Sequence, residues 1–111
     1  MNKYIVIIRL GEALPTRERV IEAAPKIRSE IESISKKDCQ LAFTTPDGST
    51  FGYLLQASVS AGVINARLCG RGSNDDGPSI LRSDDSILVV EVGDDLAGTG
   101  FSRAWSWLQH R

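Results

Sequence analysis

Residues 39–58 read CQLAFTTPDGSTFGYLLQAS, a stretch that decides the fold because it predicts a β-hairpin. Apolar side chains alternate on both sides of a turn, with Cys39, Leu41 and Phe43 before it and Phe51, Tyr53 and Leu55 after it. In the turn, Pro46 presets φ, Asp47 accepts a local backbone hydrogen bond and Gly48 adopts a positive φ. We therefore expect two antiparallel strands here, each with its apolar side chains on one face.

An amphipathic helix is predicted before this hairpin. Its apolar side chains recur at spacings of four, three, four and three residues, at Val20, Ala24, Ile27, Ile31 and Ile34. Thr16, directly after Pro15, is a suitable N-cap. Pro25 has no N–H to donate to the carbonyl of Ile21, so the helix is expected to kink, or to break in two, near residues 21–25.

Two further strands, residues 3–10 and 86–92, are apolar on both alternating faces. Such a strand is covered on both sides or faces a partner subunit. A short helix is expected over residues 60–68, with Gly70 ending it, and another over residues 101–110. Residues 70–79 are rich in glycine, aspartate and serine, a composition typical of a loop.

The predicted order is β-α-β-β-α-β-α. With right-handed crossovers it indicates an α+β fold, a ferredoxin-like βαββαβ sandwich with helices on one face and an added C-terminal helix. Its length of 111 residues fits a single domain spanning 1–111. Two strands apolar on both faces need more cover than one helical layer gives, so we expect a homodimer.

The composition argues against two classes of function, non-specific nucleic-acid binding and zinc binding. Thirteen Lys and Arg against fourteen Asp and Glu argue against non-specific nucleic-acid binding. One His and two Cys are too few for a closed zinc site of the usual type, and the two thiols are expected to stay reduced.

The apolar run after Lys3 stops at Arg9, too short for a signal peptide, and no stretch reaches the ~20 residues of a membrane span. We expect a cytoplasmic protein with no membrane association.

The last predicted helix carries the preferred binding site. Phe101, Ala104, Trp105 and Leu108 share the face expected to pack on the sheet. Trp107 lies off that stripe, beside Arg103 and His110. An exposed aromatic between two cations is typical of a hot spot for a protein partner or of a stacking platform for a base. The alternative is that Trp107 covers a core edge or a dimer contact.

The loop over residues 70–79 offers a second binding element. Arg71 lies between Gly70 and Gly72, and backbone N–H groups in such a segment can form an anion nest. The segment follows a helix and lacks Gly-Lys-Ser/Thr, so it is not a P-loop. We interpret the segment as a mobile surface loop, and in the alternative as a lid that closes over a ligand.

Paired aspartates suggest a metal site as an alternative. Mg²⁺ or Mn²⁺ binds through carboxylates, here from Asp75, Asp76, Asp84 or Asp85. Asp85 and Asp94 flank one strand, so at ~3.3 Å per residue they stand roughly 30 Å apart and cannot share an ion. Aspartates also end strands and stabilise turns. We assign no catalytic residue, and a cofactor only in this alternative.

Residues 83–93, SDDSILVVEVG, before a Trp-containing terminal helix, together with the element order, resemble short bacterial ferredoxin-like proteins related to the small CRISPR-associated endonuclease family. The resemblance implies a homodimer formed through the sheets. In the nuclease branch it implies a metal bound by an aspartate at the end of the first strand. Residues 7–11 read IIRLG and contain no aspartate, so the fold and the dimer carry over but the nuclease activity does not.

The sequence thus predicts a small non-enzymatic homodimeric binding or accessory protein, with a protein partner or a small ligand. One alternative is a metal-dependent nuclease of ferredoxin-like fold that uses the aspartates above. Another is a small-molecule sensor domain with residues 70–79 as its lid.

Overall fold

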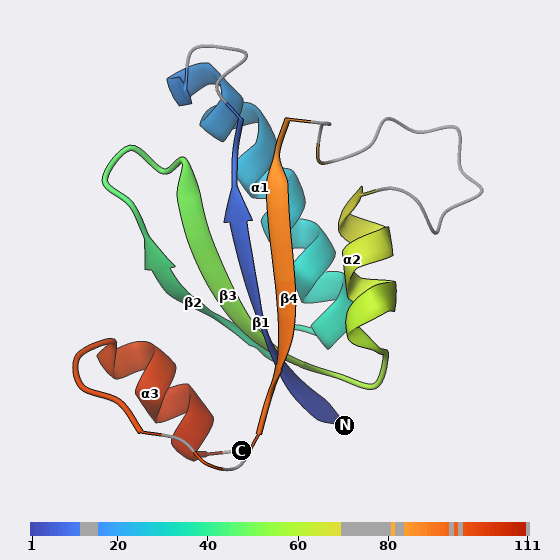
Figure 1. Cartoon of the computed structure of the whole chain (residues 1–111), viewed down its shortest axis with the longest axis vertical. Coiled ribbons are helices and arrows are strands. Elements are labelled where there is room, and N and C mark those ends of the chain that lie inside the picture. Colours follow the sequence, from blue (N-terminus) through green and yellow to red (C-terminus); the bar gives the residue numbers. More distant parts are fainter. Residues whose placement is uncertain (12–15, 70–80, 82–83, 94, 96, 111) are drawn as a thin grey trace.

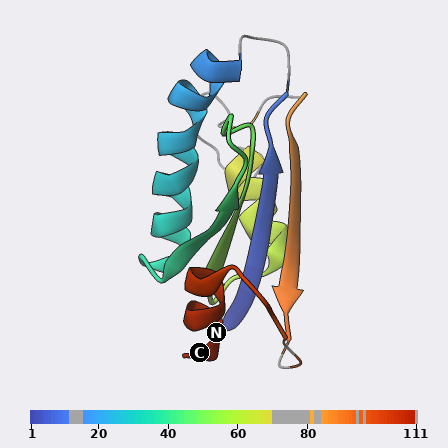
Figure 2. The same cartoon turned by 90° about the vertical axis from the view of Figure 1, so that its left-hand side faces the viewer.

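The computed structural model describes residues 1–11, 16–69, 81, 84–93, 95 and 97–110. Its elements are β1 (Asn2–Arg9), α1 (Thr16–Ser35), β2 (Cys39–Thr44), β3 (Thr50–Ala57), α2 (Ala61–Cys69), β4 (Ser86–Val92) and α3 (Ser102–Gln109). The strands form one antiparallel sheet of order β2-β3-β1-β4. Helices α1 and α2 cover one face, and α3 packs beside β2 on the other (Figures 1 and 2). The predicted α+β class is confirmed.

The core follows from the alternation of side chains along β1. Tyr4, Val6 and Ile8 point towards α1 and α2 and are buried there with Ile27 and Ile64. Ile5 points the other way and packs against a second, smaller cluster, whose buried members are Leu54, Ala104 and Trp107. The prediction that β1 is apolar on two sides is therefore confirmed, and α3 supplies part of the second cover.

Helix α1 is continuous from Thr16 to Ser35, so the predicted break into two helices is wrong. Pro25 removes one hydrogen bond and lies on the exposed side, while Ala23 and Ile27 on either side of it are fully buried. Their packing keeps the helical path despite the missing donor. Ile27 and Ile31 of the predicted stripe are buried, but Ala23 rather than Ala24 takes the fully buried position.

The hairpin is confirmed, with Gly48 at φ 74° and the Asp47 carboxylate accepting the Ser49 N–H at 3.0 Å. The predicted alternation along β2, however, is wrong at Phe43. A bulge between Leu41 and Phe43 inserts one residue. Phe43 consequently lies against Gly52 on the face opposite α1, where the absence of a Cβ leaves room for its ring.

The remaining elements match their predicted positions closely. α2 buries Ile64 and Leu68, and β4 spans the predicted residues 86–92. Gly70, Arg71, Asp75 and Asp76 lie outside the described residues, as does the whole 70–79 segment. None of the three described helices combines the length and the apolar content needed to cross a bilayer.

Candidate functional site

Helix α3 presents a different face to the sheet from the one predicted. Trp107 is buried, with 8% of its surface exposed, whereas Phe101 is 65% exposed, so the prediction of an exposed Trp107 is wrong. Phe101 is the N-cap, with φ 43° in the left-handed region, and therefore does not continue the helical stripe. Without it, the packed face is centred on Ala104, Trp107 and Leu108.

The three predicted binding residues of α3 nevertheless line one hollow of about 490 Å³, which we call the α3 hollow. Its lining residues are Gln40, Ser102, Arg103, Ser106, Trp107 and His110. The His110 ring is held by its Nδ1, which lies 2.7 Å from the carbonyl oxygen of Ser106. The α3 hollow therefore combines polar side chains with the ring of Trp107 in its wall.

A second hollow of about 450 Å³, the β2-edge hollow, adjoins the first and shares Gln40 and Arg103 with it. It is lined by Arg28, Glu32, Lys37, Cys39, Gln40, Leu41, Tyr53 and Arg103. These residues come from α1, the turn after it, β2, β3 and α3. Sequence reasoning missed this site because no local motif joins elements so far apart along the chain.

Three cations line the β2-edge hollow, but it contains one carboxylate, that of Glu32. Nε of Arg28 donates to Glu32 Oε1 at 2.9 Å, and this hydrogen bond raises the pKa of Arg28 above its ordinary value. Among the described residues, none forms an ion pair with Lys37 or Arg103. The β2-edge hollow therefore has an excess of positive charge.

Two weakly acidic groups of the β2-edge hollow stay neutral near pH 7. Burial raises the pKa of the Tyr53 phenol and, separately, that of the Cys39 thiol. A neutral phenol can donate a hydrogen bond, whereas a protonated thiol is a poor nucleophile. Tyr53 can therefore donate to a bound oxygen, whereas the described surroundings of Cys39 do not activate it as a nucleophile.

The aspartates at the start of β4 have structural partners. Asp85 Oδ2 lies 2.5 Å from Arg19 Nη2, and its Oδ1 accepts the Gly11 N–H at 2.7 Å. Asp84 packs against Gly11, where an added Cβ would lie 2.4 Å from the Asp84 Cγ. No group of three His, Cys, Asp or Glu side chains within the described ranges is placed to hold a metal ion.

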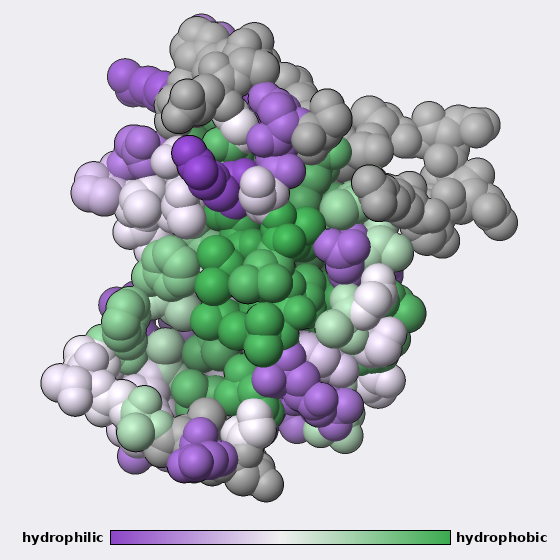
Figure 3. Space-filling model, in the orientation of Figure 1, coloured by the Kyte–Doolittle hydropathy of each residue, from purple (hydrophilic) through white to green (hydrophobic). Residues whose placement is uncertain are grey.

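The sheet face opposite α1 and α2, here called the open face, is apolar over much of its area (Figure 3). Leu88 and Val90 of β4 are 56% and 44% exposed there. Beside them, an apolar groove of about 270 Å³ runs between the sheet and α3. Its walls include Ile5, Ala42, Phe43, Leu54, Phe101, Ala104, Trp105 and Leu108.

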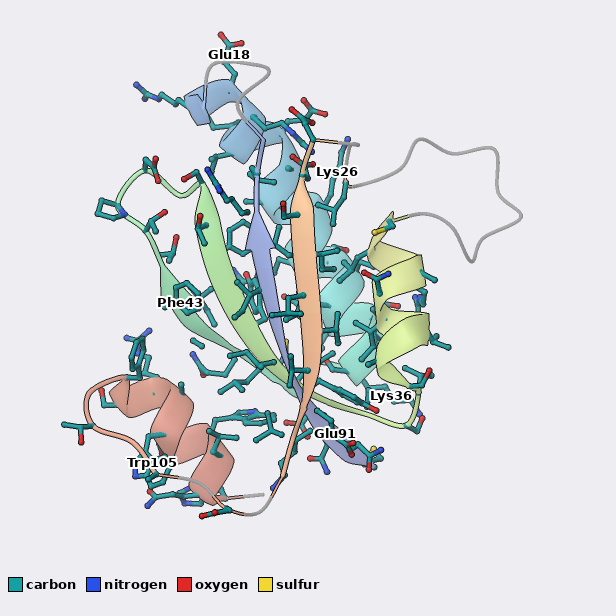
Figure 4. All side chains as sticks on the ribbon, viewed as in Figure 1. Glu18, Lys26, Lys36, Phe43, Glu91 and Trp105 are labelled. Atoms are coloured by element: carbon teal, nitrogen blue, oxygen red, sulfur yellow. The ribbon has the colours of Figure 1, made fainter. Side chains whose placement is uncertain are left out.

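Phe43 and Phe101 mark the upper end of this groove. Their rings meet edge to face with centroids 6.5 Å apart, and Figure 4 shows Phe43 above the start of α3.

Comparisons with protein-family models, with curated proteins and with solved structures find no match to this chain.

Proposed function

We propose that this chain is a ferredoxin-like binding protein that works as a homodimer, with the open face as the interface between two copies. The strand order β2-β3-β1-β4 with antiparallel neighbours supports the ferredoxin-like assignment, since a split βαβ unit pairs its strands in this way. The main support for the dimer is that two apolar side chains, Leu88 and Val90, are exposed on the open face.

The charge pattern of the open face favours burial. Along β1, the residues on this face are Lys3, Ile5, Ile7 and Arg9, so charges stand at the two ends with isoleucines between them. The neighbouring positions on β3 and β4 between those ends are Gly52, Leu54, Leu88 and Val90. A partner can therefore cover the middle of this face without desolvating a charge.

The area needed for a stable dimer brings α3 into the interface. Gly52 and Leu54 of β3 are already buried, so the exposed middle of the open face lies on β1 and β4. From the spacing of strands and residues, its footprint is roughly 160 Å². A standard interface buries about 800 Å² on each partner. We therefore place Phe101 and the apolar groove in the interface as well.

The same features favour a second copy over a different partner. A two-fold interface uses one patch on both subunits and must be complementary to itself. The open face carries a ridge, Leu88 and Val90, next to a groove walled by Phe43 and Phe101. In a two-fold dimer the ridge of each copy enters the groove of the other.

Light scattering after size-exclusion chromatography tests the dimer. We expect the wild-type protein to have twice the 12.1 kDa mass of one chain. Leu88→Asp should shift it to monomer because the carboxylate would be buried at the interface. Ile21→Asp is the matched control, since Ile21 is a 66% exposed aliphatic residue on α1, away from the open face.

A monomeric wild-type protein at about 100 µM, where a standard-size interface is saturated, would refute the proposal. Retention of the dimer by Leu88→Asp would also refute it. Circular dichroism of both variants separates loss of the dimer from loss of the fold.

A further inference from the structure

The β2-edge hollow contains side chains whose chemistry matches an anion. Arg28 extends from α1, Lys37 from the turn after it and Arg103 from α3, so three cations converge from different elements. Glu32 offsets one of them, and it engages only the Nε of Arg28 in the 2.9 Å bond. A guanidinium has five N–H donors, which leaves others of Arg28 for a ligand.

Neutral donors accompany these cations. The Tyr53 phenol and the Gln40 side-chain amide line the same hollow, and both can donate to oxygen. The volume of about 450 Å³ lies within the range of about 300–1,000 Å³ typical of small-molecule sites. The adjoining α3 hollow adds the hydroxyls of Ser102 and Ser106, with room for a polar group attached to the anion.

The backbone at Lys36 and Lys37 allows a sharp test of the hollow. Lys36 and Lys37 have φ values of 52° and 69°, in the left-handed region where a side chain is unfavourable. The Lys37 N–H donates to the carbonyl of Glu32 at 2.7 Å and closes the end of α1. Glycine is the residue that usually makes such a cap. A lysine at either position therefore carries a conformational cost that glycine would not.

A cation near a helix C-terminus is itself favourable, but that effect applies to both lysines. They differ in position. Both side chains are exposed, but Lys37 lines the β2-edge hollow and Lys36 does not. Figure 4 shows Lys36 on the side of the molecule away from α3. If the hollow binds a ligand, substitution of Lys37 should therefore weaken binding, whereas substitution of Lys36 should not.

We propose that the β2-edge hollow binds a small phosphate-bearing molecule. Arg28, Lys37 and Arg103 bind the phosphate oxygens, and Tyr53 and Gln40 donate further hydrogen bonds. The attached polar group extends along the α3 hollow towards Ser102 and Ser106. This site does not depend on the dimer proposed above, because Leu88 and Val90 do not line it.

Isothermal titration of the full chain with inorganic phosphate and with a nucleoside monophosphate, at constant ionic strength, tests the proposal. We expect saturable binding by the wild-type protein. Lys37→Gly should weaken it at least about tenfold, since a charge-assisted hydrogen bond is lost. Lys36→Gly should bind as the wild type does. Both variants should melt no lower than the wild type, because glycine relieves the left-handed backbone.

Arg103→Gln is a second variant, on an exposed position of α3, and should also weaken binding at least about tenfold. The proposal is overturned if neither inorganic phosphate nor the nucleoside monophosphate binds saturably. It is equally overturned if Lys36→Gly and Lys37→Gly bind alike, or if sodium chloride competes as well as phosphate at equal concentration.

Discussion

Arg19 and Asp85 form a buried ion pair that joins the first part of α1 to the residue before β4. Nη2 of Arg19 lies 2.5 Å from Oδ2 of Asp85, and the two side chains are 3% and 0% exposed. The other oxygen of Asp85 accepts the N–H of Gly11, just after β1. One carboxylate therefore connects the ends of three elements.

Asp85→Asn should lower the free energy of unfolding by about 3–5 kcal/mol, because it removes a buried carboxylate that binds both the Arg19 guanidinium and the Gly11 N–H. Urea denaturation followed by circular dichroism measures this loss. Glu32→Gln is the matched control, since it removes an exposed pair with Arg28 that solvent screens. Equal losses in the two variants would show that Asp85 contributes no more than a surface carboxylate.

Trp107 should contribute more to stability than Trp105. Trp107 is 8% exposed in a cluster with Leu54 and Ala104, whereas Trp105 is half-buried at the groove. Removing a buried tryptophan side chain costs about 3–5 kcal/mol, so Trp107→Ala should unfold at markedly lower urea concentration than Trp105→Ala. The reverse order would mean that α3 packs through the face predicted from the sequence.

Gly52→Ala should destabilise the contact between β2 and α3. An added Cβ at Gly52 would lie 2.4 Å from Cε1 of Phe43, so the Phe43 ring has to shift, which disturbs its contact with Phe101. Such overpacking costs about 1–3 kcal/mol. We expect a lower melting temperature and altered tryptophan fluorescence, since the groove next to Phe101 also contains Trp105.

Gly62→Ala is the control for that experiment. Gly62 lies in α2, and the nearest atom to an added Cβ is Ser60 Oγ at 3.8 Å. Alanine is the better helix former, so this variant should be as stable as the wild type or more so. If Gly52→Ala also left stability and fluorescence unchanged, the Phe43 ring would not be confined as the structure indicates.

The sequence predicted where the helices and strands lie along the chain, but it predicted less well which of their side chains face the core. Strong periodicity located α1, a continuous apolar run located β4, and residues 45–49 located the hairpin turn. The bulge before Phe43 has no signature in the residues around it, and it reverses the direction of that side chain. Likewise, the left-handed φ of Phe101 changes which residues of α3 face the sheet.

The candidate site was predicted in part. Arg103, Trp107 and His110 do line one hollow, because residues spaced by three or four share a helix face. Arg28, Lys37 and Tyr53 were missed because the approach of α1, β3 and α3 depends on the packed fold. The unusual feature in the sequence was Lys36-Lys37 at a helix end where glycine is common.

Cys39 should react slowly with alkylating agents at neutral pH in the folded protein. Burial raises the pKa of its thiol, so less thiolate is present than in the unfolded chain. The raised pKa stabilises the fold below the ordinary thiol pKa, and this contribution is lost as pH rises through the folded value. In a Cys69→Ser background, the rate of iodoacetamide labelling should have its pH midpoint higher in buffer than in urea. A midpoint in buffer equal to or below that in urea would contradict the burial of Cys39 in the wall of the β2-edge hollow.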